Sequence, residues 1–405
     1  MNALVVDGEL WTASGEALLG EAIALRRAIH AEPEIGLDCP KTTAKIRKAL
    51  EGLPLELREG PSTTGLIAIL RGSGNGRTIL LRGDMDALPL HEDTGLDFHS
   101  QTDGAMHACG HDTHVAMLAG AAHALCAERE RLNGTVVFMF QPGEEGYHGA
   151  RYMMEDGLLD DPAPDAAFAL HISPNMPAGI FASRTGPLLA SADEFEIKVI
   201  GKGGHGAMPH ETIDPVPIAC EIVLALQTLV SRKVSPNESA VLTVGKIVGG
   251  TTDNVIPETA NLLGTIRTLD ERTRTLMHEG VIRIATHIAA AHGATVEAEI
   301  IPGFPVTVCD GRIVNLAQQT ATARFGDGAW RTMPTPMMGA EDFAYVLQKL
   351  PGAMAFIGAV PEGGDYHSCC GLHSNRMVLD ERVMARGVAM HCAMAQAFLN
   401  GEAVV

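Results

Sequence analysis

Short, continuous apolar runs alternate with helical patterns over the first 172 residues of the chain. Apolar residues recur at helical spacing over residues 14–30, and a second helix fits residues 41–50. A third helix is expected through residues 115–125, with Asp112 as its candidate N-cap. The apolar runs predict four buried strands, at residues 65–70, 78–81, 135–140 and 166–172. This alternation predicts a mainly parallel sheet that is sandwiched by helices.

The pattern changes between residues 194 and 301, where residues 195–199 alternate between apolar and polar side chains, as a half-exposed strand should. The next segments predict helix, strand, strand, helix and strand, at residues 215–230, 240–248, 261–269, 271–292 and 295–301. This is the split βαβ order. We therefore expect an inserted α+β domain at residues 191–301, within an α/β/α domain formed by residues 1–190 and 302–405.

After the inserted segment the α/β pattern resumes. It predicts a helix at residues 339–350, a strand at residues 353–359 and a terminal helix at residues 379–400. In open α/β sheets, ligands bind at the carboxyl ends of the strands. The polar residues that follow the predicted strands are therefore the candidates for a functional site.

Composition narrows the classes of function. The formal net charge of −19 argues against binding to nucleic acid or to an anionic membrane surface, both of which attract Lys and Arg. No stretch approaches the roughly 18 apolar residues of a membrane span, and the first eleven residues lack a signal-peptide pattern. Eight cysteines without a regular framework indicate reduced thiols, so we expect a soluble, cytoplasmic protein.

Cys109 and His111 form the first candidate metal site. Gly110 between them gives the backbone the freedom to direct both side chains at one ion. Thiolate sulfur and imidazole nitrogen together suit zinc or another late divalent ion. The alternative is a buried cysteine near an ordinary histidine, and this pair alone is weak evidence.

Glu144 and Glu145 follow directly after a predicted buried strand. Two adjacent carboxylates at a strand end cannot both be buried in the core, and their side chains diverge. One can therefore bind a metal while the other acts as a general base. Taken alone, the two residues also fit a solvated acidic turn.

His171 ends the predicted strand at residues 166–172, and His373 lies in the run Gly-Leu-His-Ser at residues 371–374. A lone histidine in either setting is more often a satisfied core residue than a ligand. Taken together, these candidate residues favour a metal site over the separate alternatives, because most of them occupy successive loops at one expected edge of one sheet.

Five motifs follow one another along the chain. They are Asp-Met-Asp-Ala-Leu-Pro at residues 84–89, Cys-Gly-His-Asp at 109–112, Gly-Glu-Glu at 143–145, His171, and Leu-His-Ser at 372–374. With these motifs the chain resembles the aminoacylase/carboxypeptidase-type dinuclear metallohydrolases. It is most similar to the branch of hippurate hydrolases, N-acyl-amino-acid amidohydrolases and auxin-conjugate hydrolases. The resemblance spans nearly the whole chain.

The resemblance implies two divalent metal ions per subunit, of zinc, manganese, cobalt or nickel, bridged by Cys109 where many relatives use an aspartate. The remaining implied ligands are His111, Glu145, His171 and His373. Glu144 would be the general base, and Asp86 the supporting acid that orients the site. Asp84 stands where other branches place a histidine ligand, so it is not counted as a ligand, and His107 and His114 match no ligand position.

The inserted segment carries a histidine among glycines, His205, which could also be part of an exposed turn. In the resembled family the matching histidine reaches across a dimer interface to the partner's scissile carbonyl. The residues that match Asn254 and Arg267 help to bind the oxygens of the substrate. The resemblance thus implies a homodimer or a dimer of dimers, with a lid and dimerisation role for residues 191–301.

The implied reaction is hydrolysis of an N-acyl-amino acid, hippurate-like or N-acetylated, by a metal-bridged water with Glu144 as the base. A dipeptidase or carboxypeptidase on the same scaffold is the rival enzyme. A metal-loaded binding protein is a further alternative, but a pure binding site needs no base beside its ligands. The sequence leaves open the acyl group, the amino acid and the native metal.

Overall fold

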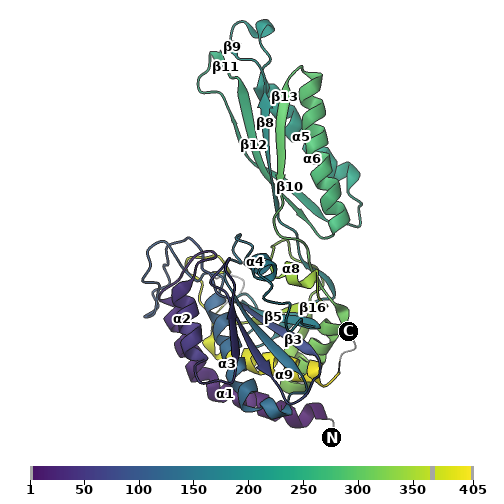
Figure 1. Ribbon diagram of the computed structural model, residues 1–405. Helices are drawn as coiled ribbons and strands as arrows, with labels where there is room; N and C mark the ends of the chain where they lie inside the picture. Colours follow the sequence, from purple (N-terminus) through teal and green to yellow (C-terminus); the bar gives the residue numbers. More distant parts are fainter. Residues whose placement is uncertain (1–2, 365–369, 403–405) are drawn as a thin grey trace. The chain divides into compact units, whose positions relative to one another are not determined.

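The computed structural model describes residues 3–364 and 370–402, and the chain divides into two compact units. Unit 1 comprises residues 1–188, 308–335 and 345–405, and unit 2 comprises residues 189–307 and 336–344. Figure 1 shows both, with many of the elements labelled. Each unit has its own sheet and is described separately below.

Unit 1 is built on an eight-stranded sheet of order β1-β2-β4-β3-β5-β16-β6-β15. The strand bounds are β1 Glu56–Glu59, β2 Leu66–Arg71, β3 Thr78–Asp84, β4 Thr135–Gln141, β5 Ala166–Ser173, β6 Phe181–Ser183, β15 Trp330–Thr332 and β16 Gly352–Gly358. The four central strands run parallel, and antiparallel pairs flank them. Every residue of β3 and β16 is buried, so both faces of these strands are covered. The expected α/β fold with a mainly parallel sheet is confirmed.

The helices of unit 1 are α1 Ala3–His30, α2 Pro40–Ala49, α3 His111–Ala127, α4 Gly149–Glu155, α7 Gly311–Phe325, α8 Ala344–Leu347 and α9 Met384–Leu399. Helices α3 and α9 pack on the central strands, and α1 packs across both helices. Nearly all residues of α3 and α9 are consequently buried. Two short strands, β7 Gly186–Leu189 and β14 Thr307–Cys309, form a separate sheet.

Unit 2 has a four-stranded antiparallel sheet of order β10-β12-β8-β13, with helices α5 and α6 packed on one face. Its elements are β8 Asp193–Ile200, β9 Gly204–His205, α5 Pro215–Lys233, β10 Ala240–Gly249, β11 Val255–Ile256, β12 Thr259–Thr268, α6 Glu271–Ala291 and β13 Thr295–Ile301. Strands β9 and β11 form a small sheet of their own. The predicted split βαβ order matches these elements, because strand alternation and helical spacing are both distinct in this segment.

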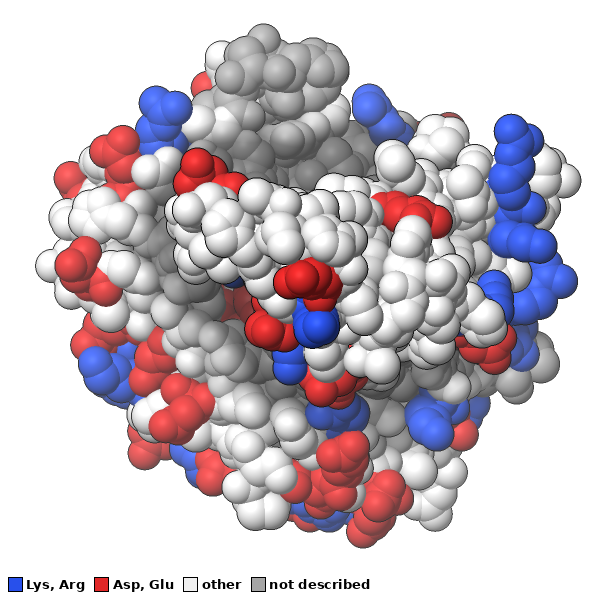
Figure 2. Space-filling view, turned by 90° about the horizontal axis from the view of Figure 1, so that it is seen from above, with Lys and Arg blue, Asp and Glu red and all other residues white. Residues whose placement is uncertain are grey.

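Helix α5 is long and apolar enough to cross a membrane by length and composition alone. Its buried residues, Ile218, Ile222, Leu226 and Leu229 among them, belong to the apolar core of unit 2. Length and composition are weak evidence for a membrane span, because the helices of a globular core pass the same test. Acidic and basic side chains lie among one another over much of the face seen in Figure 2.

The predicted boundaries of four helices are wrong. Helix α1 begins at Ala3 rather than at residue 14. Residues 339–343 are not helical, and the helix there is only α8, because the carboxylate of Glu341 accepts a hydrogen bond from the backbone of Phe343 instead. The terminal helix begins at Met384, after a 3-10 turn that Asp380 caps. Asp112 does not cap α3, since Gly110 is its N-cap and Asp112 lies inside the first turn. Helix α7 was not predicted, although Asp310 caps it.

Candidate metal centre

The ends of neighbouring parallel strands bring the acidic candidates of unit 1 to one edge of the sheet. Strand β3 ends two residues before Asp86, β4 ends three residues before Glu144, and β5 carries His171 near its end. The register pairs β3 with both β4 and β5, so the three carboxyl ends lie side by side. This edge is where an α/β sheet presents its ligand site.

Gly110 turns the chain so that Cys109 and His111 both face this edge. It has a φ of 81°, a conformation that glycine adopts without strain. A Cβ atom at this position would lie 2.4 Å from Cγ2 of Ile172. The glycine therefore lets the start of α3 approach the end of β5 closely, which brings Cys109 to His171.

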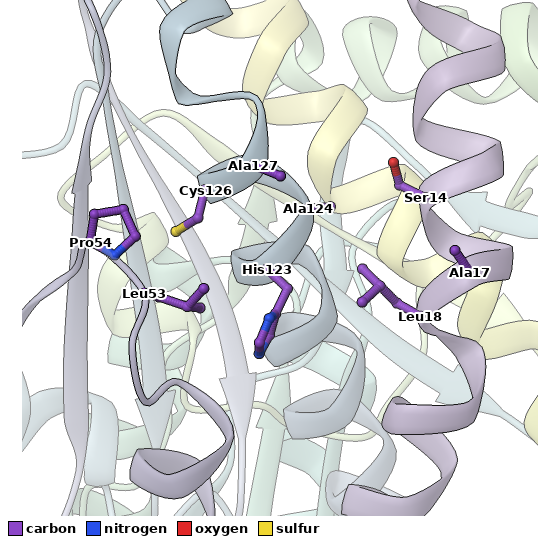
Figure 3. Close-up of a pocket in the computed structure, with 9 residues that line it drawn as sticks. All are labelled: Ser14, Ala17, Leu18, Leu53, Pro54, His123, Ala124, Cys126 and Ala127. Atoms are coloured by element: carbon purple, nitrogen blue, oxygen red, sulfur yellow. The ribbon is translucent and has the colours of Figure 1, made fainter.

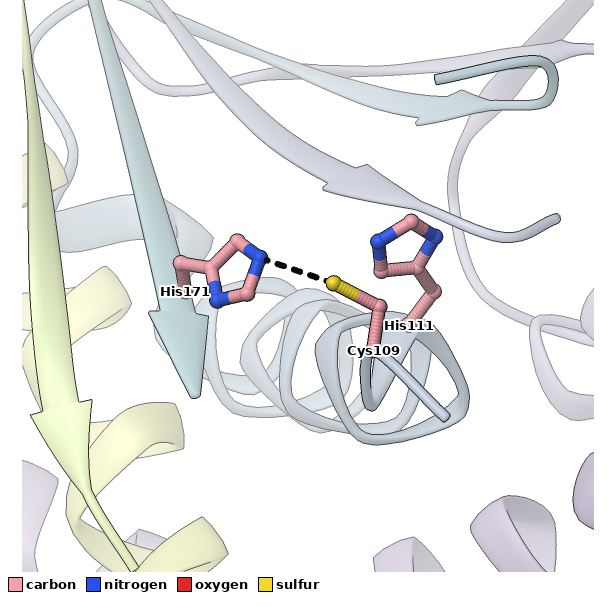
Figure 4. A group of neighbouring side chains, drawn as sticks. All are labelled: Cys109, His111 and His171. Atoms are coloured by element: carbon pink, nitrogen blue, oxygen red, sulfur yellow. Dashed lines mark hydrogen bonds between the residues drawn. The ribbon is translucent and has the colours of Figure 1, made fainter. Parts of the chain in front are cut away.

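Two groups of three potential ligands share Cys109. One contains Cys109, His111 and His171, and the other contains Cys109, Glu145 and His373, with the ligand atoms of each group within 4.8 Å of one another. In Figure 4 the sulfur of Cys109 lies between the rings of His111 and His171, and its distance to Nε2 of His171 is 3.5 Å. Because Cys109 belongs to both groups, its sulfur could hold two ions at once.

Backbone carbonyls determine which nitrogen of each buried histidine is free. Nδ1 of His111 lies 2.9 Å from the carbonyl oxygen of Asp86, and Nδ1 of His171 lies 2.7 Å from that of Ile172. Because a carbonyl only accepts, both Nδ1 atoms carry the proton and both Nε2 lone pairs are available to an ion. Nε2 of His111 and Oε1 of Glu145 are buried without a hydrogen-bond partner among the described residues, as expected for metal ligands.

Asp86 holds the turn that carries the two glutamates. Its Oδ1 accepts the backbone N–H of Glu144 at 2.9 Å, and its Oδ2 accepts that of Glu145 at 3.0 Å. The carboxylate therefore orients both side chains without occupying the ligand position. Oε2 of Glu144 and Oε1 of Glu145 each lie 3.9 Å from Nε2 of His111.

His373 comes from a loop far along the chain. Its φ of 66° is unusual for a residue other than glycine, and a backbone held in this region typically costs about 1–3 kcal/mol. The backbone N–H of His373 donates to the carbonyl of Ala108 at 2.8 Å, and Nε2 lies 3.4 Å from Oε1 of Glu145. The strained loop thus delivers its imidazole beside the segment that holds Cys109.

The charges around the centre favour cations. Burial raises the pKa of the Cys109 thiol to about 12. Burial works to lower the pKa of His111, but the Asp84 carboxylate and Cys109 raise it well above its ordinary value. Protons therefore take the place that divalent ions would occupy, and metal binding has to release them.

The candidates of unit 2 lie at opposite ends of its sheet. His205 and Asn254 are neighbours, because β9 pairs with β11 and the N–H of Gly206 donates to the carbonyl of Asn254 at 2.8 Å. Arg267 lies near the other end, where β12 runs beside the start of β8. Both His205 and Asn254 are exposed.

A surface pocket of about 530 Å³ in unit 1 is lined by no comparable group of potential metal ligands (Figure 3). It is lined mainly by apolar side chains of α1, α3 and the loop after α2. Nε2 of His123 is bound to the carbonyl of Ala49, and burial raises the pKa of the Cys126 thiol to about 12. Neither side chain is poised for chemistry there.

Comparison with known proteins identifies the family. The model of peptidase family M20/M25/M40 matches residues 80–397. The chain belongs to this family. N-acetylcysteine deacetylase of Bacillus subtilis is 41% identical over 337 residues, 83% of this chain and 87% of the relative. Thermostable carboxypeptidase 1 of Saccharolobus solfataricus is 38% identical over 384 residues, 93% of this chain and 95% of the relative.

A solved structure of the M20 family shares the fold of this chain. The Bacillus subtilis YXEP protein, described as a dinuclear metal-binding peptidase of the M20 family, superimposes with a TM-score of 0.81. It is 36% identical, and the match covers 95% of this chain and 99% of that one. The M20 protein described here is accordingly a metal-dependent amidohydrolase that uses divalent metal.

Asp84 and His114 form a third buried group with His111, and this association was not predicted. Asp84 was not counted as a ligand because it stands where other branches place a histidine, and a core or supporting role was expected for His114. The signal was present in the spacing, since His114 lies three residues after His111 on α3 and therefore on the same helical face.

Proposed function

We propose that this M20 enzyme hydrolyses N-acyl-L-amino acids, hippurate-like or N-acetylated, to a carboxylic acid and a free amino acid. The observation that carries the proposal is the pair of potential ligand groups that share Cys109, with Glu144 beside them. Cys109 is the bridging ligand, His111 and His171 complete one ion site, and Glu145 and His373 complete the other. Two divalent ions held there would supply Lewis acidity and lower the pKa of water towards ~7.

Glu144 is the general base. It takes a proton from the attacking water, whose oxygen forms a bond to the acyl carbon. The C–N bond then breaks, and Glu144 delivers the proton to the leaving amine. The position of Glu144 supports this role, because Asp86 holds its backbone N–H and its Oε2 lies 3.9 Å from Nε2 of His111, among the candidate ligands.

His205, Asn254 and Arg267 bind the substrate. Nδ1 of His205 accepts the N–H of Ala207 at 3.0 Å, which leaves the proton on Nε2 and makes that atom a donor. A donor of this kind suits the oxygen of a scissile carbonyl. Arg267 would hold the free carboxylate of the amino acid in a chain of net charge −19.

Unit 2 is proposed to serve as lid and dimerisation domain of a homodimer or a dimer of dimers. Its edge strand β10 exposes Val241, Ile247 and Val248, and Leu224 of α5 is 71% exposed. An unpaired edge with apolar side chains is a surface that a second copy can cover. We also propose a cytoplasmic location, which the free thiols of Cys39, Cys109, Cys126, Cys220, Cys309 and Cys392 support.

A carboxypeptidase is the second candidate, because a relative of 38% identity bears that name. A substrate panel distinguishes the two. The apoprotein is reconstituted separately with zinc, manganese, cobalt or nickel, and kcat/KM is measured for N-acetyl- and N-benzoyl-amino acids and for dipeptides. Preference for the acylated amino acids supports the proposal, and preference for peptides with a free amino group contradicts it.

A further inference from the structure

Asp84 is a buried carboxylate with both oxygens engaged. Its Oδ2 accepts from Nη1 of Arg82 at 2.6 Å, and its Oδ1 accepts from Nδ1 of His114. All three side chains are at most 1% exposed. Both carboxylate oxygens of Asp84 are thus held in place by its neighbours.

His114 uses both ring nitrogens. Its Nε2 accepts the backbone N–H of Ile172 at 2.7 Å, so Nδ1 must carry the proton that is donated to Asp84. With both nitrogens occupied, His114 has no lone pair left for a metal ion. Its ring instead packs against that of His171, with centroids 4.5 Å apart.

The contact with Ile172 comes where β5 loses a neighbour. The β3–β5 ladder ends at the pair Arg82 and Ala169, three residues before Ile172. Beyond that point the imidazole of His114 accepts the N–H of β5. The carbonyl of the same residue, Ile172, accepts Nδ1–H of His171. His114 therefore holds the residue whose carbonyl sets the orientation of the His171 ring.

Asp84 also reaches the other histidine of the same group. Its Oδ2 lies 3.5 Å from Nε2 of His111. Among the described residues, no hydrogen bond joins Asp84 or His114 to Glu145 or His373. The contacts are thus confined to one of the two ligand groups.

We propose that Arg82, Asp84 and His114 are positioning residues for one of the two metal ions only. They orient the ion site of Cys109, His111 and His171 and leave that of Cys109, Glu145 and His373 unaffected. This inference rests on the ligand set proposed above. Partners of this kind commonly change metal affinity by about 10–100-fold.

The test is a titration of the full-length apoprotein with cobalt(II), which resolves two stepwise dissociation constants. His171→Ala and His373→Ala serve as references that lose one ion each. His114→Leu is expected to raise the dissociation constant of the ion that His171→Ala loses by about 10–100-fold and to leave the other unchanged. His114→Gln should recover much of this affinity, because its amide can accept from Ile172 and donate to Asp84.

His391→Leu is the matched control, since His391 is also a histidine at 1% exposure but lies on α9, where its ring contacts that of Phe168. It should retain both ions at wild-type affinity. In the double variant His114→Leu/His171→Ala, the loss of metal affinity should equal that of His171→Ala alone, because the two residues act on the same ion.

The outcomes separate the inference from the proposed function. If the wild type fails to bind two ions, or His171→Ala and His373→Ala do not each lose one, the proposed ligand set is wrong. If both references behave as expected but His114→Leu binds both ions as tightly as wild type, the positioning role is wrong. A loss of both ions together, unrescued by His114→Gln, would make His114 an ordinary core residue and also overturn the inference.

Discussion

The candidate residues of unit 1 and those at the β9–β11 end of unit 2 are held in opposite ways. His111 and His171 are buried, their tautomers are set by backbone carbonyls, and Asp86 holds the turn of Glu144. His205 is exposed on a strand of two residues, and Asn254 is exposed in the turn before another such strand. The first group is preorganised within its own unit, whereas the second needs another surface to become part of a site.

The largest expected effect is that of replacing Glu144 in unit 1. Glu144→Gln should lower kcat by at least about 10²–10⁴-fold, the usual contribution of a general base, because the amide cannot take a proton. Metal content should stay near two ions, since the ligands remain. Elemental analysis and an activity assay on the same sample decide the matter. Retained activity with full metal would remove Glu144 from this role.

The next largest effect is expected for Cys109→Ser, on metal binding. Because Cys109 belongs to both ligand groups, its loss should weaken both ions, unlike the loss of His171 or His373. Stepwise metal titration measures this, and metal should also protect Cys109 from alkylation. Cys392→Ser is a suitable control, as Cys392 is buried in α9 away from the group. Two ions bound as tightly as in wild type would contradict the bridge.

His205→Ala should lower turnover by roughly 10²–10³-fold, as the removal of one donor to an oxyanion does. If the homodimer proposal holds, His205 acts in the partner's site. A mixture of His205→Ala and Glu144→Gln subunits should then regain activity after exchange, towards half of wild type per mixed dimer. In such a dimer one site carries both substitutions and the other carries neither.

Mass spectrometry must show that mixed dimers have formed. If they have and no activity returns, His205 acts within its own chain or has no role. That result would also remove Asn254 as a contact across the interface. It would leave the metal ligands of unit 1 untouched, and so would make the comparison between the two regions sharper.

The same comparison explains which features the sequence could predict. The strand ends were predictable, because continuous apolar runs at residues 135–140 and 166–172 stop just before polar residues. The hydrogen bond from the N–H of Ile172 to His114 could not be predicted, since it depends on the β3–β5 ladder ending at Ala169. The helix expected at residues 339–350 failed because a side chain competes for a backbone N–H there. Hydrogen bonds of these two kinds, one between distant segments and one local, are not encoded in the hydrophobic periodicity of the sequence.

The smallest expected effect concerns the support behind the metal centre. Asp112, next to His111, accepts from Nδ1 of His30 at 2.7 Å and pairs with Nε of Arg26 at 3.1 Å. Burial works to lower the pKa of His30, but its bonds to Asp112 and Glu92 raise it to about 9. A protonated His30 thus ties α1 to the first turn of α3.

This raised pKa sets the pH at which the support is lost. A folded-state pKa above the unfolded value of 6.5 adds stability that is fully present below pH 6.5 and declines as the pH rises through about 9. The size is on the order of 3 kcal/mol. Asp112 and Glu92 have lowered pKa values and titrate in the acid range, so they do not contribute in this window. Urea midpoints of the apoprotein between pH 6.5 and 9 should fall more steeply for wild type than for His30→Gln, in which His111 keeps its own raised pKa, whereas parallel curves would show that His30 carries no charge there.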